Sequence, residues 1–188
     1  MAQIGLKSFL YAPLKDDGTY DAVAKLAGAI DFKETLDTND AKLYSDDVLK
    51  DSDTSVSGGT IALGVDDDDD TVFCPLLGKT KVDLLVGEAT VSTYESNTND
   101  QSKHIGYGHI VRKNDGKFKV NFYPEVAFKP YSVDGKTKGE KLEYTTPNVE
   151  GTLYPSSAGH FKTEATVATE TLAIATLYAL FGKAAPTE

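Results

Sequence analysis

Alternation of apolar and polar residues along the chain predicts a fold dominated by β-strands. The segments in which every second side chain is large and apolar lie at residues 30–33, 61–65, 105–111 and 118–128. A period of two places one row of side chains on a buried face and the other on a wetter face. In the fourth segment the apolar row is Phe118, Val120, Phe122, Val126 and Phe128. Their shared parity predicts a single buried face along this unusually long strand.

Turn signals divide the strand-rich region. Pro124 lacks the N–H that a β-ladder needs, so the long segment should contain a bulge or lie at an edge there. Asp115–Gly116 and Asp134–Gly135 are dipeptides that favour β-hairpins, because glycine tolerates positive φ. We therefore expect residues 103–146 to form an antiparallel meander of three strands.

A helix is expected near the C-terminus, at about residues 169–181. Its apolar stripe, at positions i, i+3, i+4 and i+7, comprises Ile174, Leu177, Tyr178 and Phe181. Thr169 is a suitable N-cap, and Gly182 suits the position just beyond the last turn. The predicted fold class is thus mainly β, with antiparallel strands flanked by one or two α-helices.

A run of five aspartates precedes the apolar segment 71–77; it comprises Asp66, Asp67, Asp68, Asp69 and Asp70. An EF-hand calcium loop needs a central glycine and a terminal glutamate, which this run lacks. One aspartate can cap a helix, and the next one or two can interact with the positive end of its dipole. We predict a short helix start with surplus charge, its regularity limited by Pro75. The alternative is a cation site, which calcium binding abolished by Asp68→Asn would reveal.

Residues 34–59 form a long, mostly polar segment that fits neither periodicity. Embedded in it are the apolar residues Leu43, Tyr44, Val48 and Leu49. A structureless loop of this length is uncommon in a compact domain and usually has a function. One interpretation is a hairpin of two short strands. The other is an arm that docks on a neighbouring subunit through these four residues, and the spacing leaves both open.

Composition is consistent with one globular domain spanning residues 1–188. Hydrophobic residues make up 40% of the chain, enough for a core. The formal charge is −10, because 29 Asp and Glu outnumber 19 Lys and Arg. Nucleic-acid binding depends on Lys and Arg contacts to phosphates, so this balance argues against a DNA- or RNA-binding face.

No export or membrane segment is recognisable in the sequence. The first residues lack the charged start and unbroken apolar core of a signal peptide. The longest apolar run, residues 172–181, is too short to cross a bilayer. We expect a soluble protein made in a cytoplasm, with no membrane partner.

Candidate catalytic residues are few. His104 and His109 differ by an odd number, so on a straight strand they point to opposite faces and cannot chelate together. His160 has no partner at useful spacing, and Cys74 lies among apolar residues, where burial disfavours the thiolate. We expect no enzymatic activity, no metal and no cofactor.

The segment IGYGH, residues 105–109, has glycines spaced as in phosphate-binding loops. It lacks the Lys-Ser/Thr ending of a P-loop and lies within a strand pattern. Gly106 and Gly108 are instead expected to leave one strand face bare, so that a neighbouring group can pack closely.

The order of segments resembles the major tail protein, or tail tube protein, of long-tailed siphophages. The resemblance covers about residues 4–181. It rests on AGAIDFKETLDTNDAKLYSDD (27–47), SGGTIALGV (57–65), HIGYGHIVRKNDGKFKV (104–120) and TKGEKLEYTTPNVEGTLY (137–154). The five-aspartate run and Pro75 depart from the family pattern.

The resemblance implies a single tail tube domain, an antiparallel β-sandwich flanked by a helix and related in fold to the type VI secretion tube protein. In such a family six subunits close into a ring, and rings stack into a hollow tube in the virion, after assembly in the host cytoplasm. The tube forms around a tape measure protein, meets tail terminator and baseplate or initiator proteins, and passes DNA without binding it specifically. The family has no catalytic residues.

Two other classes are considered. A receptor- or carbohydrate-binding β-sandwich could use Tyr94, Tyr123 and Tyr131 as an aromatic platform, although the chain lacks tryptophan. A hydrolase with an acidic metal site would need histidine ligands that the spacing does not provide.

Overall fold

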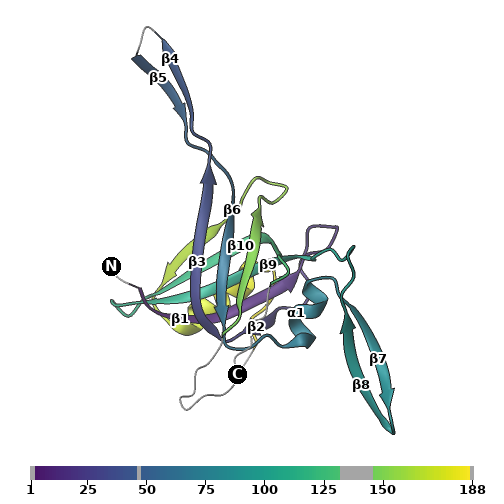
Figure 1. The fold of residues 1–188 in the computed structure, drawn as a ribbon. Helices are drawn as coiled ribbons and strands as arrows, with labels where there is room; N and C mark the ends of the chain where they lie inside the picture. Colours follow the sequence, from purple (N-terminus) through teal and green to yellow (C-terminus); the bar gives the residue numbers. More distant parts are fainter. Residues whose placement is uncertain (1–2, 46–47, 132–145, 187–188) are drawn as a thin grey trace, which may run out of the picture.

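The computed structural model describes residues 3–45, 48–131 and 146–186 (Figure 1). The described residues form twelve strands and two helices, so the predicted class, mainly β with antiparallel sheets and flanking helices, is confirmed. The strands are β1 (Gln3–Pro13), β2 (Ala24–Ala27), β3 (Ala29–Thr38), β4 (Ala41–Ser45), β5 (Val48–Asp53), β6 (Val56–Val65), β7 (Thr80–Val86), β8 (Ala89–Glu95), β9 (His104–Lys113), β10 (Phe118–Phe128), β11 (Asn148–Tyr154) and β12 (Thr163–Val167). The helices are α1 (Asp70–Leu76) and α2 (Glu170–Leu180).

One antiparallel sheet forms the body, in the order β2-β1-β9-β10-β11-β6-β3, with β12 paired to β10. The length of β10 allows it to pair with β9 on one side and with both β12 and β11 on the other. β1 and β3 also come into contact although they are far apart in this order. The sheet therefore curls around an interior.

The structure corrects the prediction of a single buried face on β10, because both of its faces are buried. Phe118 and Phe122 pack in the layer beneath α2, whereas Val126 and Phe128 point into the interior of the curled sheet. The apolar side chains of β10 change from one face to the other where its register against β9 shifts, between Tyr123 and Val126. The irregularity predicted at Pro124 is thus confirmed.

The core has two parts, one on each face of the sheet. The interior part is closed by α1 and comprises Phe9, Leu26, Ile61, Leu63, Val65, Phe73, Leu76, Leu77, Ile105, Tyr107, Tyr123, Val126, Phe128, Val149 and Leu153. The outer part lies under α2 and comprises Leu10, Ala12, Ile110, Phe118, Val120, Phe122, Ala173, Leu177 and Phe181. Sheet strands with apolar side chains on both faces require cover on both sides, which α1 and α2 help to provide.

α2 confirms the predicted C-terminal helix. Thr169 caps it by accepting a hydrogen bond from the backbone N–H of Leu172 at 3.3 Å, and Gly182 follows with φ 68°. The prediction that Gly106 and Gly108 leave room for close packing on one face of β9 is also confirmed. A Cβ on Gly108 would collide with the side chain of Leu177, and one on Gly106 would collide with Tyr20.

The predicted meander is confirmed in part. β9 and β10 flank the Asp115–Gly116 turn, with Gly116 at φ 80°. The predicted turn at Asp134–Gly135 lies outside the described residues. The third strand, β11, starts at Asn148, beyond the predicted range of 103–146, and pairs antiparallel with β10.

Candidate self-assembly surfaces

Residues 34–45 and 48–59 form the two sides of a hairpin that extends far from the body (Figure 1). β3 and β6 pair from Ala29 opposite Val65 to Thr38 opposite Val56. The ladder then continues through a backbone hydrogen bond from Asn39 to Ser55 at 2.8 Å and into the β4–β5 pair. The hairpin interpretation is therefore confirmed, and we call residues 37–53 the arm.

Apolar side chains near the tip of the arm are exposed. Tyr44 and Val48 are 61% and 63% exposed, and Leu49, opposite Tyr44, is also exposed. The side chain of Leu43, the fourth predicted contact residue, lies outside the described part. An isolated two-stranded hairpin is marginally stable in water, and projecting apolar groups gain free energy when covered. Docking on a neighbour remains a prediction.

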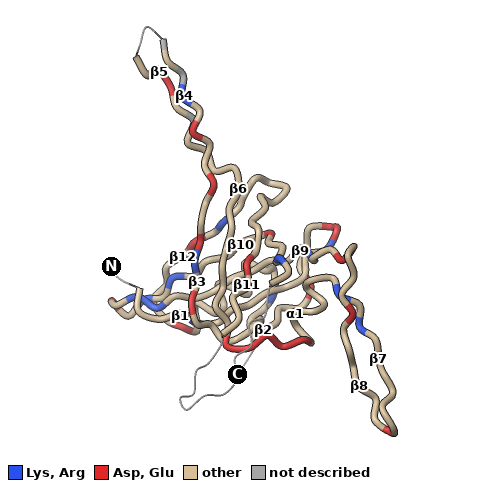
Figure 2. The backbone as a smooth tube through the Cα atoms, viewed as in Figure 1, with Lys and Arg blue, Asp and Glu red and all other residues tan. Residues whose placement is uncertain are grey.

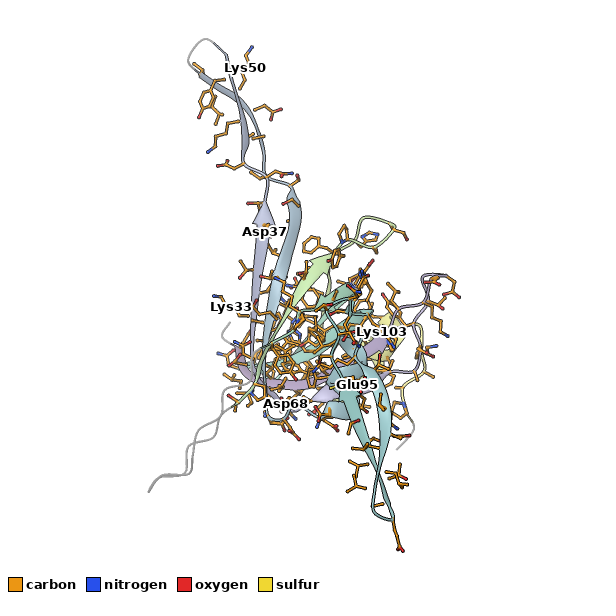
Figure 3. The ribbon with its side chains drawn as sticks, turned by 45° about the vertical axis from the view of Figure 1, so that its right-hand side comes forward. Lys33, Asp37, Lys50, Asp68, Glu95 and Lys103 are labelled. Carbon is orange, nitrogen blue, oxygen red and sulfur yellow. The ribbon has the colours of Figure 1, made fainter. Side chains whose placement is uncertain are left out.

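The arm is also acidic. Residues 37–53 contain six aspartates and two lysines. Figure 3 shows Asp37 at the root of the arm and Lys50 near its tip, both away from the body. The ion pair between Lys42 and Asp40, at 3.1 Å, is exposed and lies within the arm. The arm therefore carries a net negative charge. None of the described ion pairs joins an aspartate of the arm to a basic side chain of the body.

A second hairpin, β7–β8, projects from the opposite end of the body (Figure 1). It turns through Gly87 and Glu88, with Gly87 at φ 64°. Sequence analysis missed it, although Val82, Leu84 and Val86 alternate before the glycine. Leu84 and Val86 are 54% and 56% exposed. The chain thus presents two apolar hairpins rather than one.

The ends of the main sheet are also available for pairing. Among the described strands, β3 forms a ladder with β6 alone and β2 forms one with β1 alone. Ile30 on β3 is exposed. Each end strand therefore presents backbone groups that another strand could pair with.

The five aspartates begin a helix, as predicted. Asp69 caps α1 by accepting from the backbone N–H of Thr71 at 2.8 Å, and the Thr71 hydroxyl also donates to it and helps to lower the pKa of Asp69. Asp70 lies in the first turn. Asp66 accepts from the backbone N–H of Gly28 at 2.6 Å, which ties the β2–β3 turn to the start of α1.

The remaining aspartates do not converge on a common point. Asp68 accepts a hydrogen bond from the Tyr131 hydroxyl at 3.4 Å, and Asp67 is exposed. Over residues 3–45, 48–131 and 146–186, no group of three or more His, Cys, Asp or Glu side chains is arranged to hold a metal ion. α1 contains Pro75 and spans only residues 70–76, in line with the short helix expected.

The three histidines lie in separate places. His104 is exposed, with Nδ1 2.6 Å from Glu125, and His160 lies in an exposed turn. His109 is fully buried, and burial lowers its pKa to about 3. The Nδ2 atom of Asn121 lies 3.0 Å from Nε2 of His109, a geometry in which the neutral imidazole accepts. His104 and His109, which were predicted to point to opposite faces of the strand, thus lie in different surroundings, one exposed and one buried.

An ion-pair cluster anchors the base of the hairpin that carries the arm. Lys162 lies 2.6 Å from Glu34 on β3 and 2.8 Å from Glu164 on β12, and Lys119 on β10 also lies 2.8 Å from Glu164. Hydrogen bonds from Lys119 and Lys162 lower the pKa of Glu164 to about 2. The cluster links β3 to the centre of the sheet, so the base of the hairpin is held while its tip extends freely.

Of the three tyrosines considered for a carbohydrate-binding platform, Tyr123 and Tyr131 pack in or against the core, and Tyr94 lies on β8. Tyr123 is fully buried in the interior, and Tyr131 packs edge-on against Phe73 with ring centroids 6.0 Å apart. Cys74 is buried as well, and burial raises the pKa of its thiol. Tyr123 and Cys74 therefore belong to the core, and Tyr131 is partly buried against it.

No model of a known protein family matches the chain, and no curated protein sequence does. Neither helix of the described chain is long and apolar enough to cross a membrane. The function must therefore be argued from the surfaces that the fold presents.

Proposed function

We propose that this protein is a structural, self-assembling subunit of a siphophage tail tube. Copies close sideways into six-membered rings, and the rings stack into a hollow tube that delivers DNA. The observation that carries the proposal is the projecting arm, whose apolar residues Tyr44, Val48 and Leu49 are exposed in the isolated chain. A hairpin held out from the body in this way can reach the neighbouring copy.

Lateral closure is supported by the end strands. Among the described strands, the end strands β2 and β3 have no partner on their outer edges, and such edges are prone to strand addition. A head-to-tail ring that closes pairs every such edge and leaves none for unrelated partners. Ring formation therefore uses the edges and protects them at the same time.

The negative charge of the subunit is compatible with the passage of DNA through the tube. With a formal charge of −10 per subunit, the walls of an assembled tube repel phosphates, so that DNA slides rather than binds. Tape measure, terminator and initiator proteins are the partners that this proposal requires, in the virion tail. The arm and the sheet edges do not need a cofactor or a catalytic group for this function.

Electron microscopy tests the proposal. Concentrated protein in negative stain should show rings and hollow tubes, with six-fold symmetry in end views. The matched control is the protein with Leu172→Ser on α2, an exposed position outside the arm and the sheet edges, which should form the same tubes. Fields that contain only monomer-sized particles at high concentration would contradict the proposal.

A further inference from the structure

Four polar side chains form a compact group on the interior face of β9 and β10. Tyr107 lies opposite Tyr123, and His109 lies opposite Asn121, in the register of the two strands, so the four are direct neighbours. The rings of Tyr107 and Tyr123 are nearly parallel, with centroids 6.0 Å apart, and the ring centroids of Tyr107 and His109 are 5.7 Å apart. None of the four is more than 4% exposed. We call these four residues the polar patch.

β3 covers the polar patch. Phe32 packs on His109 with ring centroids 4.1 Å apart and lies 6.2 Å from the ring of Tyr123. The carboxylate of Glu34, two residues further along β3, lies near the hydroxyl of Tyr123. Burial first, and then this carboxylate, raise the pKa of Tyr123.

The edge of the covered region is charged. Lys162 lies 2.6 Å from Glu34, and its ammonium group is 5.5 Å from the centre of the Tyr123 ring. Figure 2 shows acidic and basic positions next to each other where the start of β12 lies near β3. The polar patch is therefore enclosed by β3 and by this ion pair.

Five buried polar atoms of this region form no hydrogen bond with the described residues. They are the hydroxyls of Tyr107 and Tyr123, Nδ1 of His109, Oδ1 of Asn121 and Oε1 of Glu34. The neutral ring of His109 accepts at Nε2 from Asn121, so its proton is on Nδ1, which donates. The Asn121 and Glu34 oxygens accept, and each tyrosine hydroxyl can do both. The set therefore mixes donors and acceptors.

Such a set needs partners. A buried polar atom without a partner loses its hydrogen bonds to solvent and gains none in return. Native proteins are only marginally stable, so five such losses in one region would remove much of the stability. Where protein groups do not reach a buried polar atom, ordered water usually pairs with it. At one buried water per about 27 residues, a chain of 188 residues holds about seven.

The chemistry of the set selects water among small occupants. A metal cation would need acceptors alone, and a small anion would need donors alone. Water donates and accepts, so one or more molecules can satisfy a donor such as Nδ1 of His109 together with an acceptor such as Oδ1 of Asn121.

We propose that ordered water molecules are bound in the interior between the polar patch and Glu34, where they join β3 to β9 and β10 by hydrogen bonds. This inference does not depend on the proposed tube function. The bound water positions β3 from its inner side, in addition to the contact of Phe32 with His109.

Oxygen-17 relaxation dispersion of the solvent tests for the bound water, because it detects water that exchanges slowly with bulk. The parent should show a dispersion. Tyr107→Phe with Tyr123→Phe should lower its amplitude by the equivalent of at least one water molecule per chain. Tyr44→Phe on the arm is the matched control and should leave the amplitude unchanged. A double variant with the amplitude of the parent overturns the proposal.

Urea unfolding of Tyr107→Phe gives a second test, in which the two possibilities have opposite signs. A hydroxyl that is bound to water loses a hydrogen bond when it is removed, so the unfolding midpoint should fall. Removal of an unpaired buried hydroxyl would raise the midpoint. An unchanged or raised midpoint overturns the proposal, and Tyr44→Phe is again the control.

Hydrogen exchange tests the link to β3. Asn121→Leu removes one acceptor of the set at a similar side-chain volume, and it should cause loss of amide protection in residues 29–38 of β3. Protection of β7 and β8, which lie far from the polar patch (Figure 1), should stay as in the parent. Unchanged protection of β3 contradicts the role given to the bound water.

Discussion

At the residue scale, His109 shows how the interior limits stability at low pH. Its side chain is fully buried beside Phe32, with ring centroids 4.1 Å apart, and close to Tyr107 and Tyr123. Burial favours the neutral imidazole, as the lowered pKa shows. The folded protein therefore does not take up a proton at this position at mildly acid pH, whereas the unfolded chain does.

Stability should fall as the pH drops below the ordinary histidine pKa of 6.5 toward about 3. One proton bound only by the unfolded chain gives a slope approaching about 1.4 kcal/mol per pH unit. Urea unfolding between about pH 6.5 and 5, above the range in which most carboxylates titrate, measures it. His109→Phe should flatten the slope, and the exposed control His160→Asn should keep it. An unchanged slope in His109→Phe would contradict this account.

Gly108 shows, also at the residue scale, how closely α2 packs on the sheet. Leu177 of α2 occupies the space that a Cβ at this position would need. Gly108→Ala should therefore lower the free energy of unfolding by about 1–3 kcal/mol through overpacking. Gly58→Ala is the control, because open space surrounds its Cβ position. Equal stability of the two variants, measured by chemical denaturation, would show that α2 does not pack as described.

At the element scale, the long strand β10 changes the face of its apolar side chains at a bulge. The hydroxyl of Tyr20 donates to the carbonyl oxygen of Pro124 at 2.8 Å, and burial raises the pKa of Tyr20 to about 12. The proline lacks an N–H, so the ladder breaks there, and the tyrosine satisfies a backbone acceptor at the break.

Tyr20→Phe should lower the free energy of unfolding by about 1 kcal/mol, since it leaves a partly buried acceptor without its partner. Tyr94→Phe, on the projecting β8 strand, is the control and should unfold like the parent. Thermal denaturation compares the three proteins. A Tyr20→Phe variant as stable as the parent would show that the hydroxyl does not stabilise the bulge.

The same element shows what the sequence can and cannot predict. The strand segments at 30–33, 61–65, 105–111 and 118–128, the α2 cap at Thr169 and the turn at Gly116 depend on local patterns, and they were predicted from them. The two-faced burial of β10 was not, because an irregular register at Pro124 moves Val126 and Phe128 to the other face without changing their parity in sequence. The β7–β8 hairpin was missed because Leu84, Leu85 and Val86 form an unbroken apolar run, which obscures the period of two.

Of the candidate surfaces, the arm was predicted from the sequence, whereas the contacts of the aspartate run were not. The arm stood out because a long polar segment with embedded apolar residues is unusual, and its position and exposure bear out the hairpin interpretation. The partners of Asp66 and Asp68, namely Gly28 and Tyr131, come from distant parts of the chain. Contacts of that kind depend on the whole fold and cannot be derived from spacing within one segment.

At the scale of the whole molecule, the described residues form a covered body with two projecting hairpins and two sheet edges that no described strand pairs with. The body has apolar side chains packed on both faces of its sheet, so it should be stable without the arm. The arm carries exposed apolar groups, which in the proposed assembly gain a partner in another copy. The proposal therefore assigns folding and assembly to different parts of the sequence.

Sedimentation velocity of the parent and an arm-deleted protein tests this division most directly. Replacing residues 39–55 by Asn-Gly joins Thr38 to Val56, which are paired in the ladder, through a two-residue turn that suits a hairpin. The account predicts that the parent forms fast-sedimenting assemblies as concentration rises, while the deleted protein has a native circular dichroism spectrum and forms no stacks of rings. Parent protein that remains a monomer at every concentration, or deleted protein that assembles like the parent, would contradict it.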